Sequence, residues 1–239
     1  MCTVSVFPGA SDENSFVLTF NRDEAVARKT SAPALTTVDD IQMIFPKDEV
    51  AGGTWLGVSE QKRVVAIMNG AYKAHKRNPP YRKSRGVVVK EFLAVDNVQE
   101  FSQRYDFRGI EPFTMIVVDW KNGLSVSERV WDTSEIHFQE LDLVPRLWSS
   151  SPLYDDQMKQ LRMGWFKKFQ NEKAFSARGI WDFHHYAGIG DKQVDLIVDR
   201  GVLKTQSISQ IEVSGNRKLF IYENLQTALV KTTSLSDLI

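Results

Sequence analysis

The chain has 239 residues, of which 42% are hydrophobic, enough to bury a core in one large domain or two small ones. Thirty basic and thirty acidic side chains give a formal net charge of zero, so the composition lacks the positive excess of a protein that binds nucleic acid or an anionic membrane. The single cysteine excludes an internal disulfide and is typical of a reducing compartment. No apolar run is long enough to span a membrane, and no secretory signal is present. We therefore expect a cytoplasmic protein with one domain over residues 1–239, no nucleic-acid partner and no membrane span; the oligomeric state stays open.

The first third of the chain is rich in β-branched and aromatic runs separated by turn residues, which is typical of antiparallel hairpins. The expected strands cover residues 2–7, 16–21, 41–45, 55–58 and 64–69. Pro46 is expected to end the third of these strands. Residues 25–40 show no clear periodicity.

The next segment, residues 73–85, is strongly basic around Pro79 and Pro80. It is either a solvated loop or a grip for a carboxylate or phosphate on a substrate. Helical spacing then predicts helices over residues 84–105, with a break and a new N-cap at Asp96 or Asn97.

Strands and helices come in blocks in the rest of the chain. The expected strands cover residues 113–120, 124–131, 135–141, 193–198, 203–213 and 218–222, and a helix is expected over residues 153–172. Blocks of this kind favour an α+β fold with antiparallel sheets over a parallel βαβ design. We find no internal repeat and no convincing linker.

Cys2 follows directly after Met1. If Met1 is removed, this residue carries both a thiol and a free α-amine. A thiol is nucleophilic as the thiolate, and an α-amine titrates near about 8, so one residue can be both nucleophile and general base. The alternative is that Cys2 is a small buried hydrophobe without a chemical role.

Arg22 and Asp23 lie at the end of the second predicted strand. If that strand pairs with residues 3–7, the two side chains can steady an α-ammonium group and bind a substrate. Asn69 ends a later strand and has two amide N–H donors for an oxyanion or a substrate. It also begins an Asn-Gly turn, and turn chemistry alone explains that pair equally well.

Several motifs occur together: Met1-Cys2, the run Leu18-Thr19-Phe20-Asn21-Arg22-Asp23-Glu24, Arg28, and Gly52-Gly53-Thr54-Trp55-Leu56-Gly57-Val58. In order and spacing they resemble the NRDE family, also named for transport and Golgi organisation protein 2. The likeness is strong up to about residue 90. It implies a fold similar to the N-terminal-nucleophile (Ntn) cysteine hydrolases, which include penicillin V acylase and bile salt hydrolase. That fold is a four-layer αββα sandwich of two mainly antiparallel sheets between helical layers.

The resemblance implies two further site positions, and the chain departs from the pattern at both. Ser150, before Ser151-Pro152, stands where the cysteine acylases carry an oxyanion asparagine. A hydroxyl donates one hydrogen bond, so a weakened role is still available to it. Gln206, in Thr205-Gln206-Ser207, stands where the family carries an arginine, and Arg200 or Lys204 are candidates for the missing charge.

The leading hypothesis is an N-terminal-cysteine hydrolase that cleaves a linear amide or related acyl bond through an acyl-enzyme on Cys2. Arg22 and Asp23 are then expected to orient the amine and thiol, and Asn69 and Ser150 are oxyanion candidates. The alternative is a non-catalytic carrier that keeps the fold and binds an apolar, haem-like or lipid-like ligand. Either function has a small-molecule substrate or ligand. We expect no cofactor and no metal, since adjacent His184 and His185 cannot share one face of a regular element.

Overall fold

The computed structural model describes residues 2–9, 12–172, 175–215 and 217–239. The chain forms two compact units. The first comprises the residues up to Arg28 together with Val144–Ser234, and the second comprises Lys29–Leu143 with Leu235–Ile239. A single domain over residues 1–239 stays a prediction.

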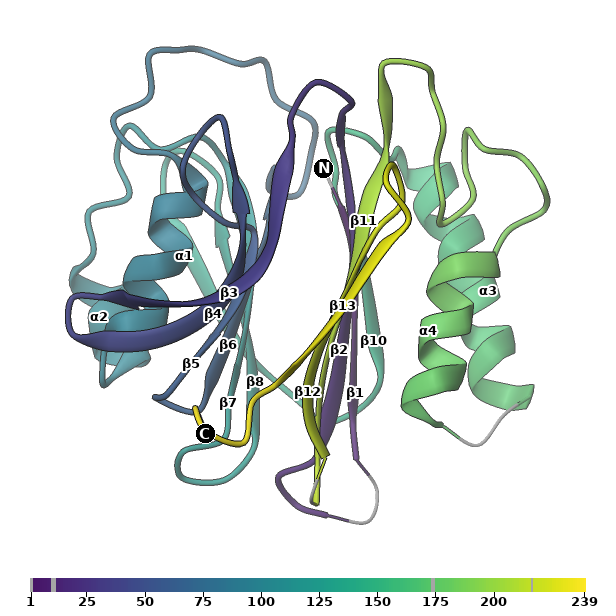
Figure 1. Cartoon of the computed structure of the whole chain (residues 1–239). Helices are drawn as coiled ribbons and strands as arrows, with labels where there is room; N and C mark the ends of the chain where they lie inside the picture. Colours follow the sequence, from purple (N-terminus) through teal and green to yellow (C-terminus); the bar gives the residue numbers. More distant parts are fainter. Residues whose placement is uncertain (1, 10–11, 173–174, 216) are drawn as a thin grey trace. The chain divides into compact units, whose positions relative to one another are not determined.

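The first unit contains a six-stranded sheet in the order β10-β1-β2-β11-β12-β13, in which every neighbouring pair is antiparallel. Two helices, α3 and α4, accompany this sheet (Figure 1). Its elements are β1 (Cys2–Pro8), β2 (Phe16–Ala25), β10 (Arg146–Ser149), α3 (Asp156–Glu172), α4 (Ala177–Tyr186), β11 (Leu203–Ser214), β12 (Arg217–Asn224) and β13 (Leu229–Ser234).

An apolar cluster joins the sheet of the first unit to its helices. Phe7 of β1 lies edge-on to Phe166 and Phe169 of α3, with ring centroids 5.4 and 6.0 Å apart. Phe183 of α4 stacks on Phe169 at 5.0 Å. Because side chains alternate along a strand, Thr3 and Ser5 share the helix-covered face with Phe7, and Cys2 lies on the opposite face.

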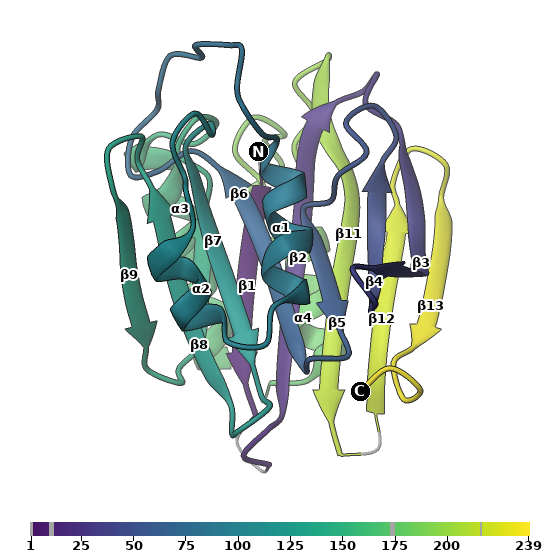
Figure 2. The same ribbon diagram turned by 90° about the vertical axis from the view of Figure 1, so that its left-hand side faces the viewer.

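The second unit contains a seven-stranded antiparallel sheet in the order β3-β4-β5-β6-β7-β8-β9. Helices α1 and α2 lie across it (Figure 2). Its elements are β3 (Thr30–Val38), β4 (Ile41–Asp48), β5 (Leu56–Ser59), β6 (Arg63–Asn69), α1 (Arg85–Ala94), α2 (Val98–Arg104), β7 (Phe113–Asp119), β8 (Ser125–Trp131) and β9 (Ile136–Leu141).

The glycines before Trp55 allow α1 to approach the sheet closely. Gly52 has a φ of +68°, a conformation that favours glycine. A Cβ atom on Gly53 would lie 2.8 Å from the backbone of Gly86 at the start of α1. The Gly52-Gly53 motif is therefore explained by a tight turn and a backbone contact.

Most expected elements are present, including the break before Asn97, whose side chain accepts a hydrogen bond from the N–H of Glu100. The prediction that Pro46 ends a strand was wrong, because β4 continues to Asp48. The absent N–H of Pro46 is tolerated because the facing part of β3 has a register shift between Ser31 and Ala34.

Two other predictions were wrong, and two strands were not predicted. Residues 193–198 form turns, in which Val194 and Asp195 donate backbone hydrogen bonds to Asp191. Val194, Leu196 and Val198 alternate with other residues as they would in a half-buried strand. Leu196 does pack into the core, but it does so from an irregular segment. The helix expected from residue 153 begins at Asp156, where Asp155 Oδ1 accepts from the Met158 N–H. Strands β3 and β13 were not anticipated, and both are largely exposed edge strands without a clear buried face.

Candidate active site

Cys2 begins β1, which lies between β10 and β2 in the first unit. The register places Cys2 opposite Arg22, and Arg22 opposite Ser207 of β11. Directly opposed residues of antiparallel strands project to the same face. Cys2, Arg22 and Ser207 therefore form one row across the face of this sheet that is opposite to α3 and α4.

The backbone nitrogen of Cys2 donates a hydrogen bond to Ser150 Oγ at 3.0 Å. The N–H of Ser150 in turn donates to the Cys2 carbonyl, also at 3.0 Å. Both residues are buried. The serine that the resemblance aligned with an asparagine thus contacts the nitrogen that becomes an α-amine if Met1 is removed.

The Cys2 thiol is buried, with 3% of the residue exposed. Burial raises the pKa of this thiol, because the thiolate loses hydration, and the neighbouring Asp23 carboxylate acts in the same direction while Arg22 opposes it. In this arrangement the thiol needs a base close by to become a nucleophile at neutral pH.

Arg22 is also buried. Its Nη1 lies 3.5 Å from the carbonyl oxygen of Arg28 and its Nη2 lies 4.0 Å from Glu24 Oε2. Glu24 forms a second ion pair with Arg28 at 3.4 Å. These acidic and basic side chains hold the Arg22 guanidinium in the row that contains Cys2.

Asp23 projects to the other face of the sheet, toward the helices. Its Oδ2 accepts a 2.5 Å hydrogen bond from the Tyr154 hydroxyl and its Oδ1 accepts a 2.7 Å bond from Thr205 Oγ1. Burial raises the pKa of Asp23, and the Arg162 guanidinium is the largest opposing influence. Asp23 is therefore placed to act on Cys2 through its charge.

Arg162 of α3 supports this arrangement from the helix side. It is fully buried, its Nη1 donates to Thr3 Oγ1 at 2.6 Å, and its Nε donates to the Val194 carbonyl at 2.9 Å. Its guanidinium carbon lies 3.5 Å from the centre of the Tyr154 ring, a cation–π contact. Sequence reasoning missed Tyr154, Thr205 and Arg162 because their contacts join distant parts of the chain.

Gln206 lies at a register shift of β11 between Thr205 and Ser207. Such a bulge re-aims neighbouring side chains, and the Gln206 amide donates to the Glu24 carbonyl at 3.2 Å. The two alternative cations are engaged elsewhere: Arg200 donates to backbone carbonyls of Gln193 and Leu153, and Lys204 pairs with Asp199 at 2.9 Å.

Ser207 and Ser209 have fully buried hydroxyl oxygens with no hydrogen-bond partner among the described residues. Both lie on the face that carries Cys2, since Ser209 is opposite Phe20 in the next row. A buried hydroxyl without a partner is costly. Ser207 is a further polar group on this face, next to Arg22 and two strands from Cys2, and the Thr205-Gln206-Ser207 run was its only sequence signal.

Asn69 ends β6 in the second unit, where it is half-buried and opposite Phe113. Gly70 has a φ of +84°, a conformation that favours glycine, and a bend over residues 71–73 follows it in place of the expected hydrogen-bonded Asn-Gly turn. The Asn69 side-chain amide makes no hydrogen bond within the described residues. Its role as an oxyanion donor stays a prediction.

His184 and His185 of α4 point to different surroundings. His184 is fully buried, with Nδ1 2.7 Å from Asn21 Oδ1 and Nε2 2.7 Å from Ser5 Oγ. Burial lowers the pKa of His184 to about 3, so the ring is neutral. His185 Nε2 lies 2.7 Å from Glu223.

Several side chains of the basic segment between residues 73 and 85 pair with carboxylates of the second unit. His75, Arg77 and Arg85 all reach Glu111, at 3.3, 3.1 and 3.0 Å. Lys83 pairs with Glu91 at 2.6 Å. These contacts engage cations that a substrate carboxylate or phosphate would need, so they favour the loop interpretation over the grip.

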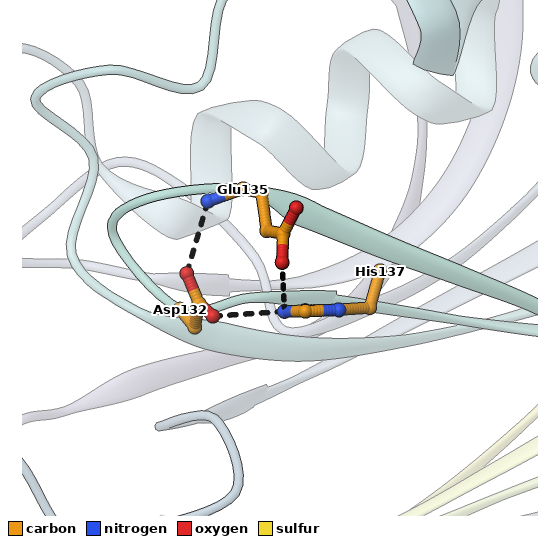
Figure 3. Close-up of side chains that lie close together, drawn as sticks. All are labelled: Asp132, Glu135 and His137. Carbon is orange, nitrogen blue, oxygen red and sulfur yellow. Dashed lines mark hydrogen bonds and ion pairs between the residues drawn. The ribbon is translucent and has the colours of Figure 1, made fainter.

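One group of side chains in the described part of the chain has the composition of a metal site (Figure 3). His137 Nε2 lies 2.8 Å from Asp132 Oδ2 and 3.7 Å from Glu135 Oε1, across the turn between β8 and β9. Asp132 Oδ1 also accepts from the N–H groups of Ser134 and Glu135. The same contacts therefore cap a hairpin turn, and the Asp132-x-x-Glu135-x-His137 spacing is the sequence signal for this group.

Among the described residues, no helix is both long enough and apolar enough to cross a membrane. In comparisons with known proteins, the model of one family, described as Transport and Golgi organisation 2, matches residues 1–180. A search of curated proteins finds no match to this chain.

Three solved structures show the fold of the chain. Penicillin V acylase from Agrobacterium tumefaciens is 12% identical, with 98% of this chain and 86% of that chain covered and a TM-score of 0.59. A variant of conjugated bile acid hydrolase from Clostridium perfringens is 10% identical, with 99% and 93% covered and a TM-score of 0.63. An N-acylethanolamine-hydrolyzing acid amidase orthologue from Caenorhabditis elegans is 13% identical, with 88% and 92% covered and a TM-score of 0.58. At these identities the likeness is one of fold, and it confirms the expected Ntn-hydrolase-like class.

Proposed function

The chain belongs to the Transport and Golgi organisation 2 family, and we propose that Cys2, once it is the first residue of the mature chain, is the nucleophile of a hydrolase acting on a linear amide or related acyl bond. The observation that carries this proposal is the 3.0 Å hydrogen bond between the Cys2 nitrogen and Ser150 Oγ. The solved structures with the same fold include an acylase, a hydrolase and an amidase.

The proposed reaction uses the two functional groups of Cys2. The α-amine takes the thiol proton, and Sγ attacks the substrate carbonyl to form a C–S bond. The resulting ammonium then gives its proton to the leaving nitrogen as the C–N bond breaks, which leaves a thioester on Cys2. Water loses a proton to the amine and attacks the thioester; the acid product leaves and the thiol is restored.

Ser150 can bond to the Cys2 nitrogen both as a neutral amine and as an ammonium, because a hydroxyl is a donor and an acceptor. Its oxygen accepts from the N–H of Cys2, so its own O–H remains available for a developing oxyanion. Asn69 is the second proposed donor. Losing one good oxyanion donor typically costs about a hundredfold in rate or more, so a serine in place of an asparagine predicts a slow amidase.

Arg22 and Asp23 have different proposed roles. Arg22 shares the sheet face of Cys2 and is proposed to bind the substrate or its developing charge. Asp23 lies on the opposite face, held by Tyr154 and Thr205. We assign to it the electrostatic stabilisation of the Cys2 ammonium.

A carrier that binds an apolar ligand, haem-like or lipid-like, and performs no chemistry is the second candidate. The observation that favours it is the buried Cys2 thiol with a raised pKa, because an inert structural cysteine has the same environment. The two candidates differ in whether the thiol is activated when the α-amine is free.

Intact-protein mass spectrometry on the purified wild type, Cys2→Ala and Cys2→Ser tests the proposal. Each protein is measured before and after a short exposure to a low dose of a thiol-directed acylating probe at neutral pH. Loss of the Met1 mass together with fast, single-site labelling that Cys2→Ala abolishes is the expected result. It would justify a screen of amide and thioester substrates.

Retained Met1 would overturn the proposal, because an amide nitrogen cannot serve as the base. Labelling of processed wild type no faster than that of a small free thiol would also overturn it. Either result would direct the search to bound apolar ligands.

A further inference from the structure

A polar cavity lies within the second unit, and none of the residues that line it is assigned to the proposed reaction. Its volume is about 420 Å³, which is in the range of small-molecule sites. Residues of β8, β9, α2 and the turn after β7 line it, together with Arg63 of β6. The cavity is therefore built entirely from one compact unit.

Alternate residues of β8 supply one wall of this cavity. Ser125, Ser127 and Arg129 project to the same face of the sheet, and all three line the cavity. The register places Glu140 of β9 opposite Ser127 and Phe138 opposite Arg129. The strand pattern therefore gathers a cation, two hydroxyls, a carboxylate and one aromatic ring.

Four of the charged side chains that line the cavity form two ion pairs with each other. Arg63 Nη2 lies 2.7 Å from Asp119 Oδ2, and its other nitrogens donate to the same carboxylate and to backbone carbonyls. Lys121 pairs with Asp96. These four charges cancel in pairs and leave Arg129 and Glu140 as the remaining charged side chains.

Arg129 is buried, with 1% of the residue exposed. Its Nε donates to Ser102 Oγ at 2.6 Å and its Nη1 to Ser127 Oγ at 2.8 Å. Among the described residues no carboxylate lies within ion-pair distance of it, and Nη2 has no hydrogen-bond partner. Burial, together with the nearby Arg63 cation, lowers the pKa of Arg129 to about 10, as expected of a buried cation without a direct counter-ion.

Glu140 is exposed and likewise has no hydrogen-bond or ion-pair partner within the described chain. Its register partner is Ser127, which lies two residues from Arg129 along β8, so Glu140 and Arg129 are diagonal neighbours on one face of the sheet. A fully anionic ligand such as a phosphate would meet the unpaired carboxylate of Glu140 at the same cavity, and like charges oppose its binding. A ligand with one negative and one positive group avoids this repulsion, because its negative group can pair with Arg129 and its positive group with Glu140.

We infer that this cavity binds a small zwitterion of the α-amino acid class, with its carboxylate on Arg129 and Ser127 and its ammonium toward Glu140. A planar guanidinium with an unused Nη2 donor matches a carboxylate, and it already lies with its central carbon 5.0 Å from the centre of the Phe138 ring. The hydroxyl of Ser125 and the amide of Gln99 are further polar groups in the cavity wall. This inference is independent of the chemistry proposed for Cys2.

Calorimetric titration of the full chain with each of the standard L-amino acids tests the inference, with acetate, methylammonium and inorganic phosphate as single-charge and anionic probes. We expect at least one amino acid to bind in a 1:1 ratio, at least about tenfold more tightly than acetate, methylammonium or phosphate. Glu140→Gln and Arg129→Lys are each expected to weaken that binding by about tenfold or more. Glu13→Gln, an exposed glutamate of the first unit, is the matched control and should bind like the wild type.

Arg129 bonds to two serines inside the unit, so Arg129→Lys is first checked for folding by circular dichroism. If it does not fold, the surface variant Glu140→Gln and the smaller change Ser127→Ala decide the test. The inference is overturned if no amino acid binds at concentrations up to about 10 mM, if Glu140→Gln leaves binding unchanged, or if phosphate binds as tightly as the best amino acid. The last outcome would identify a simple anion site.

Discussion

The Tyr154 hydroxyl donates a 2.5 Å hydrogen bond to Asp23 Oδ2, although 131 residues separate the two in the sequence. Tyr154 reaches this position because its backbone N–H closes a turn onto the carbonyl of Ser150, the residue whose hydroxyl contacts the Cys2 nitrogen. One short turn thus supports both the candidate nucleophile and the buried carboxylate behind it.

Tyr154→Phe is expected to destabilise the protein by about 1–3 kcal/mol, because it removes a donor from a buried carboxylate. Without that donor the pKa of Asp23, already raised by burial, should rise further. Urea denaturation followed by circular dichroism measures the loss of stability. Tyr186→Phe is the control, since Tyr186 is 77% exposed, and an equal loss there would contradict the assignment.

Ser150→Ala is expected to slow the labelling of processed Cys2 by about tenfold, which corresponds to the loss of one hydrogen bond of about 1.4 kcal/mol. Stopped labelling reactions analysed by intact mass give the rate. Ser149→Ala is the matched control: Ser149 is the preceding residue, it lies opposite Thr3 in β10, and its hydroxyl makes no hydrogen bond within the described residues. If both variants react at the wild-type rate, Ser150 has no part in activating Cys2.

Glu111→Gln is expected to loosen the basic segment between residues 73 and 85. Glu111 is buried and is the shared partner of His75, Arg77 and Arg85, so its neutralisation leaves several cations without their counter-charge. Limited trypsin digestion should cut this segment faster than in the wild type. Glu100→Gln removes an exposed i,i+4 pair with Arg104, which is worth about 0.3–0.5 kcal/mol, and should leave the cleavage rate unchanged.

Local sequence patterns predicted part of this structure. The pairing of Cys2 with Arg22 follows from two apolar runs on either side of a turn-rich linker, and the N-cap at Asn97 from a polar break in a helical repeat. Edge strands β3 and β13 escaped because their mostly exposed residues have no buried face to generate alternation.

Long-range contacts account for the parts of the site that the sequence did not reveal. The placement of Tyr154 and Arg162 depends on how α3 packs on the sheet, and the bulge at Gln206 depends on the pairing of β11 with β2. Neither leaves a local signal. Arg129 was missed for a related reason, since its burial is set by Ser102 of α2 and Phe138 of β9.

His184 predicts how stability depends on pH. Burial, with smaller effects from His185 and Arg162, lowers its folded-state pKa to about 3, against about 6.5 in the unfolded chain. Between these values the unfolded state binds a proton that the folded state does not, so the stabilising effect is fully present above about pH 6.5 and is lost as the pH falls toward 3. The slope contributed by this residue approaches about 1.4 kcal/mol per pH unit.

Denaturation midpoints of the wild type and His184→Gln at pH 7, 6 and 5 give the difference in slope, in which other titrating groups cancel. The variant should be less stable at pH 7 and should lose less stability on acidification. Parallel pH profiles for the two proteins would show that His184 titrates normally in the folded state.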